Sequence, residues 1–240
     1  MLYPVHHKKL SKLVFLTILI TKASFALSTE EGLWLDLSVN EKLTDDNKWG
    51  YSLESQTRFL NKENYYEESI LDGGIAYYVT PLLSFWGGYE WISHSPLNGE
   101  DRKNQIWEQM VWQVYENDLF IIRTRSRFEQ TSMIHQPEWQ NMFREKVNIY
   151  FPKIVGDNII PVIYDEVFIA LNKPEWEDNK TIEQNRIFMG LDITLSKTFF
   201  LEVGYLQQYE YGLHNTTLTN VAYIGFNFNN SGVPVSQYVR

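Results

Sequence analysis

His94 and Ser95 are the residues for which a reaction is most easily named. A histidine that removes the proton of a serine hydroxyl turns that oxygen into a nucleophile, provided that the two side chains lie within about 3 Å of each other. Neighbouring residues of a β-strand point to opposite faces, and Pro96 distorts the backbone directly after the pair. The two side chains can therefore meet only if the strand has already ended, and a polar loop is the simpler interpretation.

Arginines at alternate positions form a second group, beginning with Arg123, Arg125 and Arg127. Side chains alternate along a strand, so these three guanidinium groups share one face. Such a face either lines a selective aqueous path or neutralises itself with carboxylates and fills the space as a plug, which a narrow cylinder favours. The whole group comprises Glu54, Arg58, Glu90, Arg123, Arg125, Arg127, Glu129, Arg144, Glu166, Arg186 and Glu202.

Other chemistry has little support in the sequence. His94, His135 and His214 each fall in or beside a different long loop, and this spacing does not indicate a metal site. The acidic loop 175–179 lacks the spaced ligands of a calcium loop. The chain has no cysteine, P-loop, G-x-S-x-G motif or dinucleotide fingerprint. We therefore expect no metal and no cofactor, and we favour a role other than catalysis.

The elements that must position these residues are β-strands, because apolar and polar residues alternate with period two. Leu33, Leu35 and Leu37, for example, alternate with Asp36 and Ser38. Bacterial barrels made of one chain have even numbers of strands, so we expect ten or twelve. The pattern itself yields eleven candidates, at about 33–40, 49–59, 71–79, 83–91, 104–115, 120–129, 142–152, 161–171, 186–193, 198–210 and 217–228.

The connections between these segments are of two kinds that alternate along the chain. Short connections with turn residues fall at 80–81, 117–118 and 196–197. Alternation is expected when the hairpins of a barrel close tightly at one end and loosely at the other. The long polar connections are 61–67, 94–103, 131–141, 172–181 and 211–217.

The basic residues indicate which face lies inside. Every lysine after residue 26 except Lys146 falls in a loop, a turn or a strand end, whereas most arginines lie within strands on the polar face. A water-exposed outer face would accept lysine freely, while arginine beside glutamate suits a crowded interior. The opposite face is rich in Leu, Ile, Val and Phe, as a lipid-facing band is. Glycines on the polar face leave room for long side chains: Gly50, Gly74, Gly88, Gly190 and Gly204.

The first 26 residues predict export rather than structure. Lysines near the start, the apolar run 13–20 and the small residues Ser24 and Ala26 are typical of a secretory signal peptide cleaved after Ala26. The remaining residues, 27–240, form one domain without a linker. The chain as a whole carries a formal charge of −9, which argues against nucleic acid as a partner.

Several segments resemble an uncharacterised family of exported bacterial outer-membrane β-barrels of unknown function. The likeness extends over nearly the whole chain after residue 26, and it implies a barrel in the outer membrane of a Gram-negative cell with no assigned activity. The residues that carry it are Trp34, Gln56-Thr57-Arg58-Phe59, Arg125-Ser126-Arg127-Phe128-Glu129-Gln130, Asp165-Glu166-Val167-Phe168, Gln184-Asn185-Arg186 and Leu201-Glu202-Val203-Gly204-Tyr205.

We therefore predict an all-β protein: a single antiparallel up-and-down transmembrane β-barrel of 10–12 strands with a charged lumen, located in the outer membrane. Its role is predicted to be structural or that of a narrow channel. The expected partners are outer-membrane lipids, lipopolysaccharide and the barrel-assembly machinery. Phe228 supplies the aromatic residue with which outer-membrane barrels commonly end, yet residues 229–240 follow it. Either this segment is a periplasmic tail or the last strand is misplaced.

Two alternatives stay open at this point. His94 and Ser95, followed by Asn98-Gly99, are similar in composition to the rim of outer-membrane lipid hydrolases of the phospholipase or lipid A deacylase type. A soluble periplasmic barrel that binds an apolar ligand would show the same alternation with its faces reversed.

Overall fold

The computed structural model of the 240-residue chain describes residues 27–43, 48–61, 66–94, 102–152, 154–156, 158–177, 179–213 and 215–229. The predicted signal peptide (1–26) lies outside these residues, and so does the predicted tail from residue 230 onward. Within the described ranges, no helix is long and apolar enough to cross a membrane. The strands are β1 (Leu27–Lys42), β2 (Trp49–Leu60), β3 (Tyr66–Thr80), β4 (Leu83–His94), β5 (Arg102–Glu116), β6 (Ile121–Met133), β7 (Trp139–Tyr150), β8 (Ile159–Ala170), β9 (Asn179–Thr194), β10 (Phe199–Gly212) and β11 (Thr216–Phe228).

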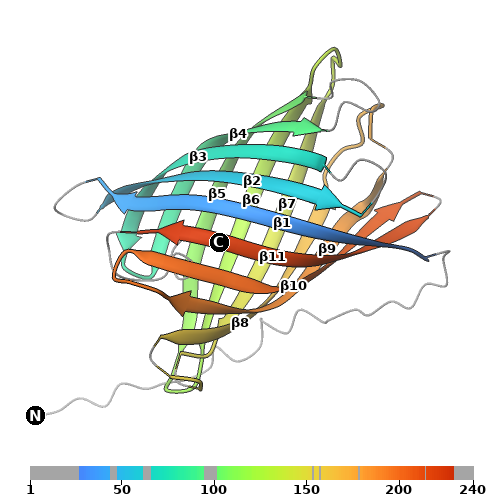
Figure 1. Ribbon diagram of the computed structural model, residues 1–240. Coiled ribbons are helices and arrows are strands. Elements are labelled where there is room, and N and C mark those ends of the chain that lie inside the picture. The colour runs from blue at the N-terminus through green and yellow to red at the C-terminus, as the bar shows by residue number, and fades with distance from the viewer. Residues whose placement is uncertain are drawn as a thin grey trace, which may run out of the picture.

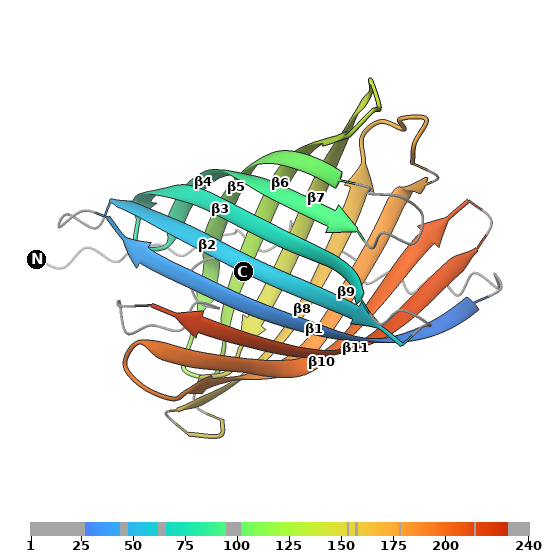
Figure 2. The ribbon, with the colours of Figure 1, turned by 45° about the horizontal axis from the view of Figure 1, so that its top comes forward.

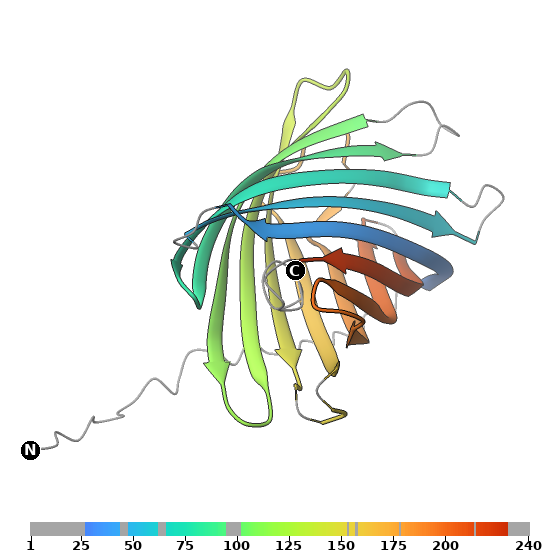
Figure 3. The ribbon, with the colours of Figure 1, turned by 60° about the vertical axis from the view of Figure 1, so that its left-hand side comes forward.

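The strands form one closed barrel in which each strand pairs with its neighbours in the chain. Successive strands are antiparallel, and β1 completes the circle by pairing with β11 (Figure 1). Turning the molecule shows the continuous wall and the tilt of its strands (Figures 2 and 3). The sequence-based prediction of an all-β, up-and-down barrel is therefore confirmed.

The number of strands is odd, whereas the expected number was ten or twelve. The described residues contain eleven strands, the number that the alternation pattern yields directly. An all-antiparallel circle requires an even number, but β1 and β11 run parallel, with Leu33 opposite Ala222 and Val39 opposite Phe228. One parallel pair removes the parity requirement, because it joins two strands that point the same way.

The connections divide between two rims of the barrel. The first rim, where β1 starts and β2 ends, holds all five connections that the sequence predicts to be long. The second rim, where β1 ends, holds the three predicted short turns, which are now 81–82, 117–120 and 195–198. Connections 43–48 and 151–158 also lie at the second rim, so the contrast between the rims is weaker than predicted.

The two faces of the wall have opposite chemistry, in the sense that the sequence predicts. Outward side chains are apolar and exposed: Ile75 is 56% exposed and Met189 is 64% exposed. Arg123, Arg125 and Arg127 point inward, and each is at most 9% exposed. The lumen is therefore the polar side of this barrel.

Glycines on the inward face make room for large aromatic rings, as the sequence predicts. Gly190 and Gly204 are opposite each other on β9 and β10, and the ring of Phe188 lies against both. A Cβ atom at either glycine would overlap that ring and a backbone carbonyl oxygen. Gly74 and Gly88 make the same kind of space for Trp107.

Replacing one of these glycines tests whether the barrel depends on this close packing. Gly190→Ala is expected to destabilise the barrel by about 1–3 kcal/mol, because Phe188 must leave its position. The free energy of unfolding of the detergent-folded protein in guanidinium chloride measures the effect. Gly87→Ala is the matched control, since its Cβ would meet only one atom, at 3.8 Å. Equal stability of the two variants would contradict the packing argument.

Candidate functional site in the charged lumen

The inward side chains surround a cavity of about 310 Å³. Arg123 is not part of its lining: this residue is buried closer to the second rim, where its Nη2 donates to Gln113 Oε1 at 2.8 Å. The other residues of the predicted charged group all line the cavity: Glu54, Arg58, Glu90, Arg125, Arg127, Glu129, Arg144, Glu166, Arg186 and Glu202. The structure therefore brings nearly the whole predicted group to one site.

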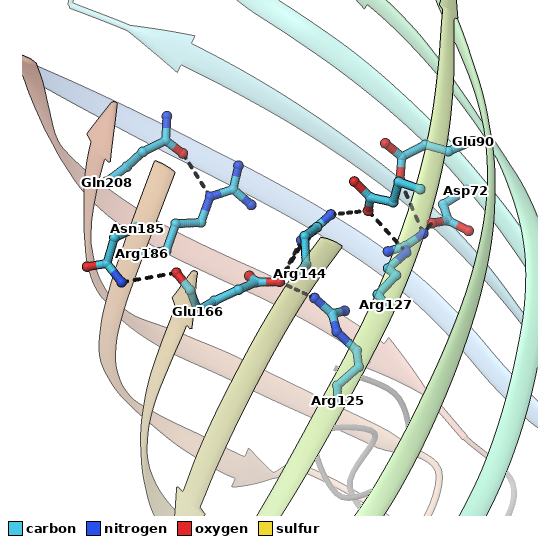
Figure 4. Close-up of polar contacts among 10 residues, drawn as sticks. Asp72, Glu90, Arg125, Arg127, Arg144, Glu166, Asn185, Arg186 and Gln208 are labelled. Carbon is cyan, nitrogen blue, oxygen red and sulfur yellow. Dashed lines mark hydrogen bonds and ion pairs between the residues drawn. The ribbon is translucent and has the colours of Figure 1, made fainter. Parts of the chain in front are cut away.

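Arg144 on β7 joins two deeply buried carboxylates of the site, and Figure 4 shows its contact with Glu166. Its Nη1 lies 2.6 Å from Glu129 Oε1, and its Nη2 lies 2.8 Å from Glu166 Oε1. Glu166 also accepts a hydrogen bond from Arg125, and Glu129 lies 3.2 Å from Nε of Arg127. The result is a continuous chain of alternating charges that crosses strands β6, β7 and β8.

Arg127 extends this chain along the wall to strands β3 and β4. Its Nη2 donates to Asp72 Oδ2 at 2.9 Å and lies 3.6 Å from Glu90 Oε2. Asp72 and Glu90 belong to β3 and β4, whereas Arg127 belongs to β6, so this contact reaches past β5 inside the barrel. The Arg127 guanidinium also lies 4.1 Å from the ring centroid of Trp107. These side chains thus pair across the inner surface of the wall beyond neighbouring strands.

A smaller group of charges lies near the first rim. Arg58 is paired with Glu68, and His94 Nδ1 lies 3.2 Å from the other oxygen of the same carboxylate. Lys103 Nζ lies 2.8 Å from Glu177 Oε1. Ser95, the predicted partner of His94, lies outside the described residues, so the hydrolase geometry stays untested.

Apolar and aromatic side chains fill other parts of the lumen. This feature goes beyond the predicted charged lumen, because the sequence places Trp34 and Phe188 on the polar face without indicating that they form a core. One cluster comprises Trp34, Tyr150, Ile160, Val162, Phe188, Leu206, Val221 and Tyr223. A second cluster comprises Ala76, Trp86, Trp107 and Val111. The ion pairs and these two clusters thus occupy parts of the lumen beside the cavity.

Several acidic residues that line the cavity were absent from the predicted group: Asp36, Glu67, Glu68, Asp72, Glu177, Glu183 and Glu210. Glu68 and Asp72 both point inward from β3, in the same phase as Gly74 and Ala76. That shared phase is the signal that could have found them. The described residues contain no group of three potential metal ligands.

These observations define a class of protein: a closed, porin-like β-barrel with an apolar outer wall and an ion-paired lumen. Among solved structures, the chain is similar to the NanC porin in its rhombohedral crystal form, with a TM-score of 0.53 and 14% sequence identity over 82% of this chain and 96% of that one. At this level of identity, the similarity establishes the fold alone.

The chain belongs to the family described as "Protein of unknown function (DUF2490)", whose model matches residues 31–219. It is also 26% identical, over 186 residues, to the uncharacterized protein MexAM1_META1p0181 of Methylorubrum extorquens. That alignment covers 73% of this chain and 77% of the relative. The resemblance to an uncharacterised barrel family is thus confirmed.

Glu166 offers the sharpest test of the charge chain. Glu166→Gln leaves Arg125 without its carboxylate and Arg144 with only Glu129, so we expect a loss of about 3–5 kcal/mol in the free energy of unfolding. Guanidinium chloride unfolding in detergent measures it. Glu145→Gln is the control, because Glu145 faces outward and bonds to Ser126 alone among the described contacts. Equal losses in the two variants would show that the lumen pairs are unimportant.

Proposed function

We propose that this protein is an integral outer-membrane β-barrel whose side-chain-filled lumen gives it a structural or narrow-channel role. The observation that carries the proposal is the sidedness of the wall: apolar residues outside and paired charges inside. Water would favour the reverse arrangement, whereas a bilayer requires this one. Export through a signal peptide cleaved after Ala26 is part of the proposal.

The dimensions and the outer surface support this location. Each strand has 12 to 16 residues, more than the 9–11 or so that a tilted strand needs to cross a bilayer. Exposed aromatic residues gather near the second rim, where Trp49 contacts Tyr77 and where Phe199 stacks on Phe226 and Phe228. Such belts are typical of the interface between lipid and water.

Two pairs of polar groups that face outward in the middle of the wall bond to each other. Ser126 Oγ donates to Glu145 Oε2 at 2.6 Å across β6 and β7. Asn185 Nδ2 donates to Asp165 Oδ1 at 2.5 Å across β9 and β8. This pairing lowers the cost of exposing these polar side chains to hydrocarbon.

The contents of the lumen decide between an open pore and a narrow one. Ion pairs reach from β6 past β5 to β3 and β4, and two apolar clusters occupy further space. A charged, ion-paired interior also gives no support to the alternative of a soluble barrel that holds an apolar ligand. The geometry therefore supports a barrel that restricts free diffusion.

A charge on the outer wall tests membrane embedding. Ile75→Arg is expected to lower the stability of the inserted barrel by about 2–4 kcal/mol, because the guanidinium would face hydrocarbon. Wild type is expected in the outer-membrane fraction with heat-modifiable migration on a gel, and the variant in reduced amount. Leu195→Arg, in a turn of the second rim, is the control and should behave as wild type. Recovery of wild type in the soluble periplasmic extract would refute the proposal.

Conductance in a planar bilayer tests the narrow lumen. Wild type is expected to show small current steps or none, because ion-paired side chains and two apolar clusters occupy part of the lumen. The double variant Arg127→Ser with Arg144→Ser shortens two of these side chains and is expected to conduct more. Lys173→Ser with Lys197→Ser removes the same charge outside the strands and should leave the current unchanged. Large steps from wild type would contradict a filled lumen.

A further inference from the structure

Arg186 differs from the other arginines that line the cavity. Arg58, Arg125, Arg127 and Arg144 each lie within 4 Å of at least one carboxylate oxygen. Arg186 has no such partner among the residues that the structure describes. Its one polar contact there is the hydrogen bond from Nε to Gln208 Oε1, at 2.9 Å (Figure 4). The two terminal nitrogens of its guanidinium group are therefore not engaged by an acidic side chain.

Gln208 keeps the charge of Arg186 apart from the nearest acidic residue on β10. The Gln208 amide accepts from Arg186 through Oε1 and donates through Nε2 to Glu210 Oε1, at 3.1 Å. A neutral amide thus occupies the position at which a carboxylate would neutralise the arginine. Glu166 is likewise engaged elsewhere, with Arg125 and Arg144.

The surroundings hold the Arg186 guanidinium in place inside the cavity. It lies 5.0 Å from the ring centroid of Trp34 and 4.6 Å from that of Phe168. The guanidinium groups of Arg58 and Arg144 contact the same two rings, at 3.9 and 4.3 Å. A pre-ordered, planar, permanently charged donor beside an open volume of about 310 Å³ matches a small planar or tetrahedral anion.

We propose that Arg186 is the main contact of a binding site for a small oxyanion, either a carboxylate or a phosphate, inside the lumen. A carboxylate or phosphate accepts two parallel hydrogen bonds from a guanidinium fork. Such a ligand would supply the oxygen partners that no carboxylate of the described residues places within 4 Å of Arg186. This inference deepens the proposed function by naming a class of solute for the barrel, and it rests on that function for its biological meaning.

Titration of the detergent-solubilised full-length barrel tests the site, with the indole N–H signal of Trp34 as the NMR reporter. The signal is assigned from a Trp34→Phe spectrum. At constant ionic strength, acetate is expected to shift the signal saturably, whereas acetamide, its neutral isostere, is expected to leave it unchanged. A parallel titration with inorganic phosphate decides which oxyanion the site prefers. No saturable shift with either acetate or phosphate would overturn the proposal.

Two variants remove the site in different ways. Arg186→Gln is expected to weaken acetate and phosphate binding by about tenfold or more, the usual effect of losing a charged hydrogen bond. Gln208→Glu retains Arg186 but supplies an internal carboxylate, and we expect the same loss. Lys197→Gln removes one positive charge outside the lumen and should bind as wild type. Affinities equal to wild type in either lumen variant, with heat-modifiable migration showing a folded barrel, would refute the assignment.

The result of the anion titration can be distinguished from the result of the experiments that test the proposed function. Oxyanion binding is measured in detergent and does not depend on cellular location, whereas fractionation does not depend on Arg186. A membrane-embedded barrel that binds neither oxyanion would overturn this inference alone. A soluble protein that binds acetate through Arg186 would overturn the proposed location, whereas the proposal of an oxyanion site at Arg186 would stand.

Discussion

Charge neutralisation inside a closed cylinder is the constraint on which this structure depends. Removing an ion from water costs several kcal/mol, and four of the guanidinium groups that line the cavity are paired with carboxylates that the barrel itself delivers. Arg144 meets Glu129 and Glu166 only while β6, β7 and β8 keep their register. A slip by one residue would turn a strand's arginines toward the outside. The lumen therefore helps to specify the wall that encloses it.

Packing and charge act together in the same space. Glycines at positions 190 and 204 admit the ring of Phe188, and the apolar clusters that result occupy volume that water would otherwise fill. Arginines then lie over aromatic faces, as Arg127 does over Trp107. A lumen built in this way encloses a pocket of about 310 Å³ beside the ion pairs and the apolar clusters.

Alternation in the sequence predicts the barrel and the inward phase of Arg123, Arg125 and Arg127. It also predicts that glycines on the inward face make room for large side chains. It fails where one strand carries mixed signals: in β5, Trp107 and Val111 point inward while Glu108 points outward, so the phase of 104–115 is ambiguous. The inward phase of Asp72 could be predicted, but its pairing with Arg127 could not, because that contact joins β6 to β3 past two other strands of the folded wall. The parallel closing pair is a property of the whole circle, and no local pattern encodes it.

The odd number of strands has a topographic consequence. Because β1 and β11 run parallel, the start of β1 at Leu27 and the end of β11 at Phe228 lie at opposite rims. In a bilayer, the two extremities of the barrel would face different compartments, whereas an even-stranded barrel returns its chain to the side from which it set out. Assembly of this barrel in a bilayer would thus have to move the start of β1 across the lipid together with the long connections of the first rim.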